Sequence, residues 1–233
     1  MSDPTTPRAL VTGGNGNLGQ AVSRLLLDAG YQVHVTVHDQ AAQATFAYGL
    51  LKEHLVVHVG DLSIEADVRR IFSEVGSPLA ALVATVGGFH GGPFAEVTEE
   101  IVDHQYRINL KSSILTLEHA YAAMAANDGG AAAVLVANRP ALSAGPGVAV
   151  TTAMKAGIVG LVKSVAEEWR ATGITVNAIA PGIMDTPENR RAMPKADPTR
   201  WPTTQQVAEV IGFLLSAEGA IVTGATIPVF GRS

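Results

Sequence analysis

Short apolar runs recur along the chain and are separated by longer segments of mixed character. The runs are rich in Val, Ile, Leu and Ala, as expected for strands that are buried on both faces of a parallel sheet. One run begins at Arg8. The others lie at residues 32–37, 55–59, 79–86, 131–137, 175–179 and 226–230.

The segments between these runs place apolar residues three and four positions apart, which predicts amphipathic helices. In the first of them Leu18, Val22 and Leu26 share one face, and Gly30 ends the helix. The other helices are expected at residues 63–75, 98–126, 151–171 and 207–215. Alternating strands and helices predict an α/β fold, a doubly wound parallel sheet flanked by helices, and we expect residues 1–233 to form a single domain.

A glycine-rich turn lies in residues 8–19, between the first strand and the first helix. Such a turn lets backbone N–H groups approach a pyrophosphate, because glycine has no Cβ, and the helix N-terminus adds the positive end of its dipole. An ordinary strand-to-helix turn is the alternative, but the position near the N-terminus favours nucleotide binding. The expected cofactor contacts in this turn are Gly13, Asn15, Gly16, Asn17, Leu18 and Gly19.

His38 and Asp39 follow the second strand. In Rossmann-type folds an acidic residue here, roughly 20 residues after the glycine turn, hydrogen-bonds the ribose hydroxyls of NAD. Asp39 is the acid available, and no Arg or Lys nearby in the sequence pairs with the 2′-phosphate of NADP. The pattern therefore favours NAD over NADP, although both residues are equally consistent with a plain surface turn.

Asp61 and Leu62 follow the third strand. Asp61 is placed either to accept a hydrogen bond from an adenine amino group or only to shape the turn. Ser63 is predicted to be the N-cap of the next helix.

Three loops at the predicted carboxyl ends of strands are candidate ligand-binding loops, since ligands bind at that edge of an open α/β sheet. Two glycine pairs lie in residues 87–92, so we expect Thr85, Val86 and Gly87 to contact a cofactor. Residues 138–147 hold two Pro and two Gly. Residues 184–202 are polar and Pro-rich without periodicity, which predicts a substrate lid.

The composition excludes several classes of function. A formal net charge of −5 argues against a nucleic-acid or anionic-membrane surface. The chain has no Cys, and its seven His show no metal-ligand spacing, so we expect no metal. The N-terminus lacks an apolar signal core, and the apolar run at 131–137 is too short to span a bilayer. We expect a cytoplasmic protein.

These motifs occur in the order typical of the short-chain dehydrogenase/reductase family, which the chain resembles over essentially its whole length. The residues concerned are the glycine turn at 12–19, Asp61-Leu62, the segment 106–111 and the segment 176–182. The resemblance implies a Rossmann-type sheet, an NAD or NADP cofactor and a small-molecule substrate. It assigns Asn109 to the active site, and Pro181, Gly182, Ile183 and Thr186 to the nicotinamide side.

The chain departs from the family at the catalytic residues. The family uses a Tyr, a Lys four positions later and a Ser thirteen positions before the Tyr. Lys155 matches the Lys, but Thr151 stands in place of the Tyr and Asn138 in place of the Ser. An aliphatic alcohol is a poor proton shuttle, because it titrates far above a phenol. Lys155 is expected to bind the nicotinamide ribose, Asn138 to polarise a substrate oxygen and Asn109 to hold a water.

Two segments show a narrower resemblance, to dihydropteridine reductases: the loop 86–92 and the segment 184–197 with Trp201. A quinonoid dihydropterin is electron-poor, and its proton can come from water, so this substrate class tolerates loss of the Tyr. The leading hypothesis is an oxidoreductase that reduces a small carbonyl or quinonoid acceptor. The alternative is a non-catalytic cofactor-binding regulator or partner subunit, and a weaker one is an isomerase or cyclase.

A stripe of mostly small residues lies at helical spacing in the predicted helix 151–171: Ala156, Val159, Gly160 and Lys163. Such a stripe permits close approach of a second helix, and the family forms dimers and tetramers through its long helices. We therefore expect a homodimer or homotetramer.

Overall fold

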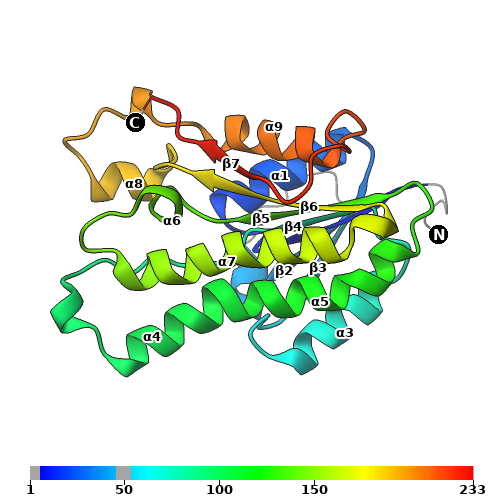
Figure 1. The fold of residues 1–233 in the computed structure, drawn as a ribbon, viewed down its shortest axis with the longest axis horizontal. Helices are drawn as coiled ribbons and strands as arrows, with labels where there is room; N and C mark the ends of the chain where they lie inside the picture. The colour runs from blue at the N-terminus through cyan, green and yellow to red at the C-terminus, as the bar shows by residue number, and fades with distance from the viewer. Residues whose placement is uncertain (1–5, 46–53, 233) are drawn as a thin grey trace.

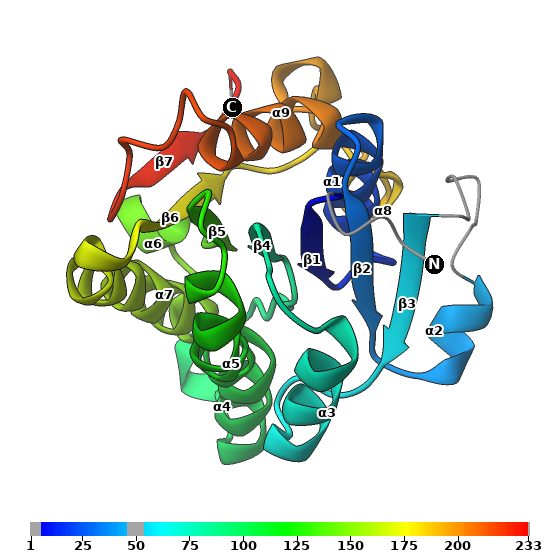
Figure 2. The ribbon, with the colours of Figure 1, turned by 90° about the vertical axis from the view of Figure 1, so that its right-hand side faces the viewer.

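The computed structural model describes residues 6–45 and 54–232. Its centre is a parallel sheet of seven strands in the order β3-β2-β1-β4-β5-β6-β7 (Figures 1 and 2). The order reverses direction after β1, so the predicted doubly wound α/β fold is confirmed. The strands are β1 (Arg8–Thr12), β2 (Gln32–Val37), β3 (Leu55–Val59), β4 (Ala81–Ala84), β5 (Ala131–Val136), β6 (Ile174–Pro181) and β7 (Thr226–Val229).

Helices cover both faces of the sheet (Figure 2). Helices α1 and α9 lie on one face, and α3, α4, α5 and α7 lie on the other. The helices are α1 (Asn17–Asp28), α2 (Gln40–Thr45), α3 (Glu65–Val75), α4 (Glu99–Gln105), α5 (Ser112–Ala125), α6 (Pro140–Ser143), α7 (Ala149–Glu168), α8 (Pro187–Ala192) and α9 (Thr204–Leu215), with short helical turns η2 (Phe94–Glu96), η3 (Tyr106–Lys111), η4 (Arg170–Thr172) and η5 (Pro198–Arg200).

Each face of the sheet packs into its own apolar core, because successive side chains of a strand point to opposite faces. In β1, Leu10 belongs to the core beneath α3, α5 and α7, whereas Ala9 and Val11 belong to the core beneath α1 and α9. β5 is buried along its entire length, which explains its run of Ala and Val. The two cores hold the carboxyl ends of the strands in fixed positions.

The predicted helix at 98–126 is one continuous helical segment in the structure. α4 continues without a break through η3, a π-helical turn, into α5. The π-turn carries Asn109, which is fully buried. Such turns widen a helix locally and often occur where a side chain must be re-aimed.

Other boundaries correct the sequence predictions. Ser63 is not the N-cap of α3: that position is Ile64, which makes no side-chain cap, whereas the Ser63 N–H donates to the Asp61 carboxylate. The loop 138–147 contains α6, and residues 184–202 contain α8 and η5. Thr186 caps α8 by accepting a hydrogen bond from the Asn189 N–H, so a local cap orders a segment that lacks apolar periodicity.

Within the described ranges, α7 is the one helix that is long and apolar enough to span a membrane. Its residues Ile158, Val162 and Ala166 pack into the core against the sheet. That packing accounts for the apolar character of the helix.

Candidate cofactor site and active site

A cavity of about 710 Å³ lies at the carboxyl edge of the sheet. Its walls come from the glycine turn, the segments after β2, β3 and β4, the π-turn and α8. The structure brings together most of the predicted cofactor contacts in this wall. They are Gly13, Asn15, Gly16, Asn17, Leu18, Gly19, His38, Asp61, Leu62, Thr85, Val86, Gly87 and Thr186.

The glycines of the turn are required by close contacts. Gly13 has φ +67°, and a Cβ there would lie 3.0 Å from Thr85 Oγ1. A Cβ on Gly14 would lie 2.5 Å from Val35 Cβ, and one on Gly19 would lie 2.2 Å from the Gly13 carbonyl oxygen. The turn is therefore pressed against β2 and β4 and against the first turn of α1. This packing leaves its open side toward the cavity.

The start of α1 presents unused donors to this cavity. Gly16 occupies the N-cap and provides no side-chain cap. The N–H groups of Asn17, Leu18 and Gly19 have no acceptor in the described part of the chain. Free amides at a helix N-terminus, behind a turn without Cβ atoms, fit a pyrophosphate, so the residues present suit a dinucleotide.

Asp39 has a local role. Its Oδ1 accepts a hydrogen bond of 2.7 Å from the Ala42 N–H, which caps α2, and Asp39 does not line the cavity. Its neighbour His38 lines the cavity, as do Thr36 and Val37, which the sequence did not single out. The helix cap therefore accounts for an acidic residue at this position.

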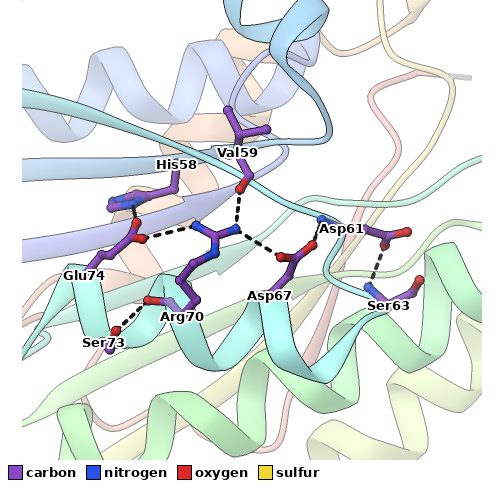
Figure 3. Close-up of polar contacts among 8 residues, drawn as sticks. All are labelled: His58, Val59, Asp61, Ser63, Asp67, Arg70, Ser73 and Glu74. Carbon is purple, nitrogen blue, oxygen red and sulfur yellow. Dashed lines mark hydrogen bonds and ion pairs between the residues drawn. The ribbon is translucent and has the colours of Figure 1, made fainter.

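Asp61 lines the cavity at the exit of β3 (Figure 3). Its Oδ1 accepts a 2.8 Å hydrogen bond from the Ser63 N–H, and its own N–H donates to Asp67 Oδ2 at 2.9 Å. The other oxygen of the Asp61 carboxylate has no protein partner in the described ranges. It remains available to accept a hydrogen bond from a ligand.

Lys155 lies behind Gly87, which lines the cavity, and is not itself among the lining residues. Its Nζ donates a 2.8 Å hydrogen bond to the Val136 carbonyl oxygen, and the residue is 6% exposed. Burial lowers the pKa of the Lys155 ammonium to about 8, because the charged form is poorly solvated there. A Cβ on Gly87 would lie 2.8 Å from Nζ and 2.7 Å from Asn109 Oδ1, so only glycine allows these two groups to sit so close to the loop.

Asn109 clamps the glycine-rich loop that follows β4. Its Oδ1 accepts from the Gly88 N–H and its Nδ2 donates to the Gly88 carbonyl oxygen, both at 3.1 Å. Nδ2 also lies 3.1 Å from Gln105 Oε1. These contacts fix the backbone of Gly88 on the π-turn.

Thr151 clamps the same loop two residues further on. Its Oγ1 accepts from the His90 N–H at 2.9 Å and lies 3.0 Å from both the His90 carbonyl oxygen and Gln105 Oε1, either of which its proton can reach. Thr151 is 1% exposed. Its hydroxyl is therefore committed to the loop and to Gln105.

Gln105 joins the two halves of this clamp, which we define as Asn109, Gln105 and Thr151. Its Oε1 accepts from Asn109 and faces Thr151, and the residue is 2% exposed. Sequence reasoning missed Gln105. The available signal was its position one turn before Asn109, on the same helical face.

Asn138 is half-buried and uses its Oδ1 to accept from the Ala141 N–H at 3.0 Å. Its Nδ2 has no acceptor in the described part of the chain, so a donor remains free. Pro181, Gly182 and Ile183 do not line the cavity. The Pro181 carbonyl accepts from the Arg139 N–H and the Gly182 N–H donates to the Val229 carbonyl, so these two residues fix the end of β6.

α8 lies in the predicted lid and contacts the glycine turn. Asn17 Nδ2 donates a 2.8 Å hydrogen bond to Glu188 Oε2, which joins residues 171 positions apart. Both side chains line the cavity. This pair, the Asn17–Glu188 latch, places a carboxylate beside the first turn of α1. A hydrogen bond from its own backbone N–H, and then the one from Asn17, lower the pKa of Glu188, so the carboxylate is ionised at neutral pH.

The cavity wall also contains residues that the sequence analysis did not assign as cofactor contacts, because their positions depend on how elements cross. Several come from η3 and its flanks, and others from α8 and the loop after β3. They are Gly60, Ser63, His104, Arg107, Ile108, Ser112, Met184, Glu188 and Asn189.

The chain is similar in sequence to known proteins. The family described as enoyl-(acyl carrier protein) reductase matches residues 14–231. The 3-oxoacyl-(acyl-carrier-protein) reductase of Rickettsia conorii is 29% identical over 240 residues, which cover 99% of this chain and 98% of that protein.

Solved structures show the same similarity. An oxidoreductase of the short-chain dehydrogenase/reductase family from Burkholderia thailandensis is 27% identical with a TM-score of 0.88, over 97% of this chain and 92% of that chain. ElxO, solved with NADP bound, is 22% identical with a TM-score of 0.90, over 97% of this chain and 98% of that chain. Because ElxO is only 22% identical to this chain, the comparison with it shows a shared fold alone.

Proposed function

This chain belongs to the short-chain dehydrogenase/reductase family, whose members are NAD(P)-dependent oxidoreductases, and from that premise we propose that it transfers hydride to a small, electron-poor carbonyl or quinonoid, pterin-like acceptor. The observation that supports this class of acceptor is the hydrogen bonding of Thr151. Its hydroxyl is buried and hydrogen-bonded to the loop and to Gln105, so no acid stands where the family places its Tyr.

The protein's own groups have separable tasks in this proposal. The amides at the start of α1 hold the pyrophosphate, and Asp61 accepts from the adenine. When bound, the cofactor supplies the hydride. Lys155 binds the nicotinamide ribose hydroxyls, and the free Nδ2 of Asn138 polarises the acceptor oxygen. The product proton comes from water, which an electron-poor acceptor tolerates because hydride addition does not need prior protonation.

The preference for NAD that Asp39 suggested gains no support. Asp39 caps α2, and a structure of similar fold, ElxO, was solved with NADP bound. Arg107 lines the cavity and has no ion-pair partner in the described ranges, so a cation is present that the sequence alone did not place there. The cofactor is therefore proposed as NAD or NADP, and both belong in the test.

The first experiment titrates NADH and NADPH into the purified protein by calorimetry. Absorbance loss is then followed with quinonoid dihydropterin and with a panel of ketones. We expect micromolar binding and turnover of the quinonoid acceptor, with ketones at least about tenfold slower. Turnover of ketones at the higher rate would overturn the acceptor class.

The alternative function is a non-catalytic cofactor-binding regulator or partner subunit. It is favoured by the same Thr151 clamp, which stabilises the fold whether or not a reaction occurs. Tight dinucleotide binding without turnover on any acceptor would establish this alternative.

We propose further that the protein is a cytoplasmic homodimer or homotetramer without nucleic-acid or membrane partners. Gly160 supports a helix-to-helix interface, because the space beyond its Cα is open to solvent and Ala156 beside it is exposed. Sedimentation equilibrium tests this state, and a monomer at micromolar concentration would contradict it.

A further inference from the structure

A network of charged groups on α3 holds the loop that follows β3 (Figure 3). Arg70 lies at its centre. Its Nη2 donates to the Val59 carbonyl oxygen at 2.7 Å and to Asp67 Oδ1 at 3.1 Å, and its Nη1 donates to Glu74 Oε1 at 3.2 Å. One guanidinium thus joins the last residue of β3 to two carboxylates of α3.

Asp67 carries the connection from Arg70 to the cavity. Its second oxygen, Oδ2, accepts the Asp61 N–H at 2.9 Å. Between the two anchored backbone groups lies Gly60, where a Cβ would be 3.1 Å from Arg70 Nη2 and 3.3 Å from Asp67 Cβ. The backbone from Val59 to Asp61 is therefore seated directly on Arg70 and Asp67.

The side chains of this network are charged at neutral pH, and His58 contacts one of them, Glu74. The Asp61 N–H and then Arg70 lower the pKa of Asp67, and His58 and then Arg70 lower the pKa of Glu74. His58 Nδ1 lies 2.8 Å from Glu74 Oε2, which fixes the carboxylate that faces Arg70. The planar guanidinium has its donors directed to three acceptors, so its orientation is well defined.

The orientation matters because of what Asp61 presents. With its N–H held by Asp67 and its Oδ1 held by the Ser63 N–H, the Asp61 side chain cannot rotate freely. One carboxylate oxygen is left without a protein partner, at the wall of the cavity. A fixed acceptor distinguishes ligands that carry a donor from those that carry an acceptor at the same position.

We propose that Arg70 and Asp67 are positioning residues that aim the free oxygen of Asp61 at the exocyclic amino group of the cofactor's adenine, and thereby make the site select adenine over hypoxanthine. This inference rests on the proposed function, since it assumes a dinucleotide in the cavity. Hypoxanthine carries a carbonyl oxygen where adenine carries the amino group, so it cannot donate to Asp61.

The test compares affinities for two cofactors that differ only at this group. The probes are NADH or NADPH, whichever binds more tightly, and the corresponding hypoxanthine dinucleotide, both titrated by calorimetry. The wild type is expected to prefer the adenine form by about tenfold or more, because a hydrogen bond to a carboxylate is lost with hypoxanthine. In Arg70→Met and Asp67→Asn the preference is expected to fall to about twofold to threefold, mainly through weaker adenine binding.

Arg69→Met is the matched control. Arg69 lies beside Arg70 on α3 and pairs with Glu65 of the same helix, without contact to the loop. It is expected to retain the wild-type preference. Because the ratio of two affinities cancels a uniform loss of folded protein, a purely structural role of Arg70 would lower both affinities and leave the ratio unchanged.

Each outcome has one meaning. An unchanged ratio in Arg70→Met, or no preference in the wild type, would overturn the inference while dinucleotide binding stands. A ratio lost equally in Arg69→Met would also overturn it. If the wild type bound neither NADH nor NADPH, the proposed function itself would fail.

Discussion

At the scale of single residues, the Thr151 hydroxyl has a structural role at the position where the family resemblance implies a catalytic Tyr. The family resemblance marks it as the place of a missing phenol. The structure gives its hydroxyl partners in His90 and Gln105, 61 and 46 positions away in the chain. The family resemblance predicted that Thr151 replaces a Tyr, but the sequence did not predict the clamp. The clamp residues meet only through the crossing of α7 with the π-turn and the loop after β4.

We expect that Thr151→Tyr does not restore ketone reduction. The phenol cannot occupy the space of the Thr hydroxyl, and its introduction leaves the His90 N–H and Gln105 without their partner. Thr151→Val should destabilise the protein by about 2–4 kcal/mol for the same reason, whereas Thr151→Ser should remain within about 1 kcal/mol of the wild type. Urea unfolding and NAD(P)H oxidation measure both effects. A gain of tenfold or more in ketone reduction by Thr151→Tyr, with unchanged stability, would contradict the clamp.

Lys155 leads to a second prediction, about pH. Its folded pKa of about 8 lies below the ordinary value of 10.5, so the unfolded chain binds the proton more tightly. Wild-type stability should therefore rise between pH 8 and 10.5. At pH 7 burial of the charged Lys155 lowers the free energy of unfolding. Lys155→Met removes this effect and also loses the hydrogen bond to Val136, so the variant should be more stable by about 1–2 kcal/mol. The gain should vanish near pH 10.

Denaturant titrations of both proteins at pH 7 and pH 10 measure this difference. Cofactor affinity should fall at least about tenfold in the same variant, because the ribose loses its charged donor. If Lys155→Met were destabilised equally at both pH values, burial of the Lys155 charge would not destabilise the folded protein.

At the scale of elements, the sequence predicted every strand and most helices of the described ranges, but only some of their ends. β2 and β3 match the expected bounds because their apolar runs are flanked by polar turns. The structure of residues 184–202, the predicted lid, was harder to predict. α8 has six residues and no buried side chain, so it is held by the Thr186 cap, the Asp185–Arg190 ion pair and the Asn17–Glu188 latch rather than by an apolar face. Asp39 was ambiguous in the sequence for a related reason, since helix capping and ribose binding both use a carboxylate.

The Asn17–Glu188 latch predicts an effect on cofactor binding. Glu188 places negative charge beside the amides that are expected to hold the pyrophosphate. Glu188→Gln keeps an acceptor for Asn17 but removes the charge, so dinucleotide affinity should rise by about threefold to tenfold at low salt and by less at 0.5 M salt. Calorimetry at both salt concentrations measures it. Glu209→Gln, an exposed site on α9, removes the same charge at a distance and should have no effect. If Glu188→Gln bound the dinucleotide more weakly than the wild type, the Glu188 charge would not be repelling the pyrophosphate.

At the scale of the whole molecule, the doubly wound parallel sheet followed from the sequence pattern, since alternating elements of this length allow few topologies. The strand order and the division of the core between the two faces of the sheet come from the structure. A buried histidine pair was not foreseen. His34 in β2 and His58 in β3 lie side by side, with His34 Nδ1 2.9 Å from His58 Nε2 and His34 5% exposed. A histidine in an apolar strand gives no sign in the sequence that its partner is another histidine on the neighbouring strand.

This pair should make global stability depend on acid. Burial, and then the charges of His58 and Arg8, lower the pKa of His34 from 6.5 to about 4. The unfolded chain therefore takes up a proton first, and stability should fall as the pH drops from 6.5 to 4, by about 3 kcal/mol from this residue. His34→Gln should flatten the curve over that window. Urea midpoints at pH 7, 5.5 and 4 measure it, and parallel curves for the two proteins would exclude His34 as the source.

The clamp around Thr151 also bears on how this protein can evolve. A change of Thr151 to Tyr in one step would remove the contacts to His90 and Gln105 before any benefit from a phenol could be realised. The loop and Gln105 would have to change first, and those changes are harmful while Thr151 is still present. Thr151 is thus constrained by its neighbours, and a lineage that carries this clamp is expected to reach new substrates by altering residues 184–202 or Asn138 rather than by introducing a phenol at position 151.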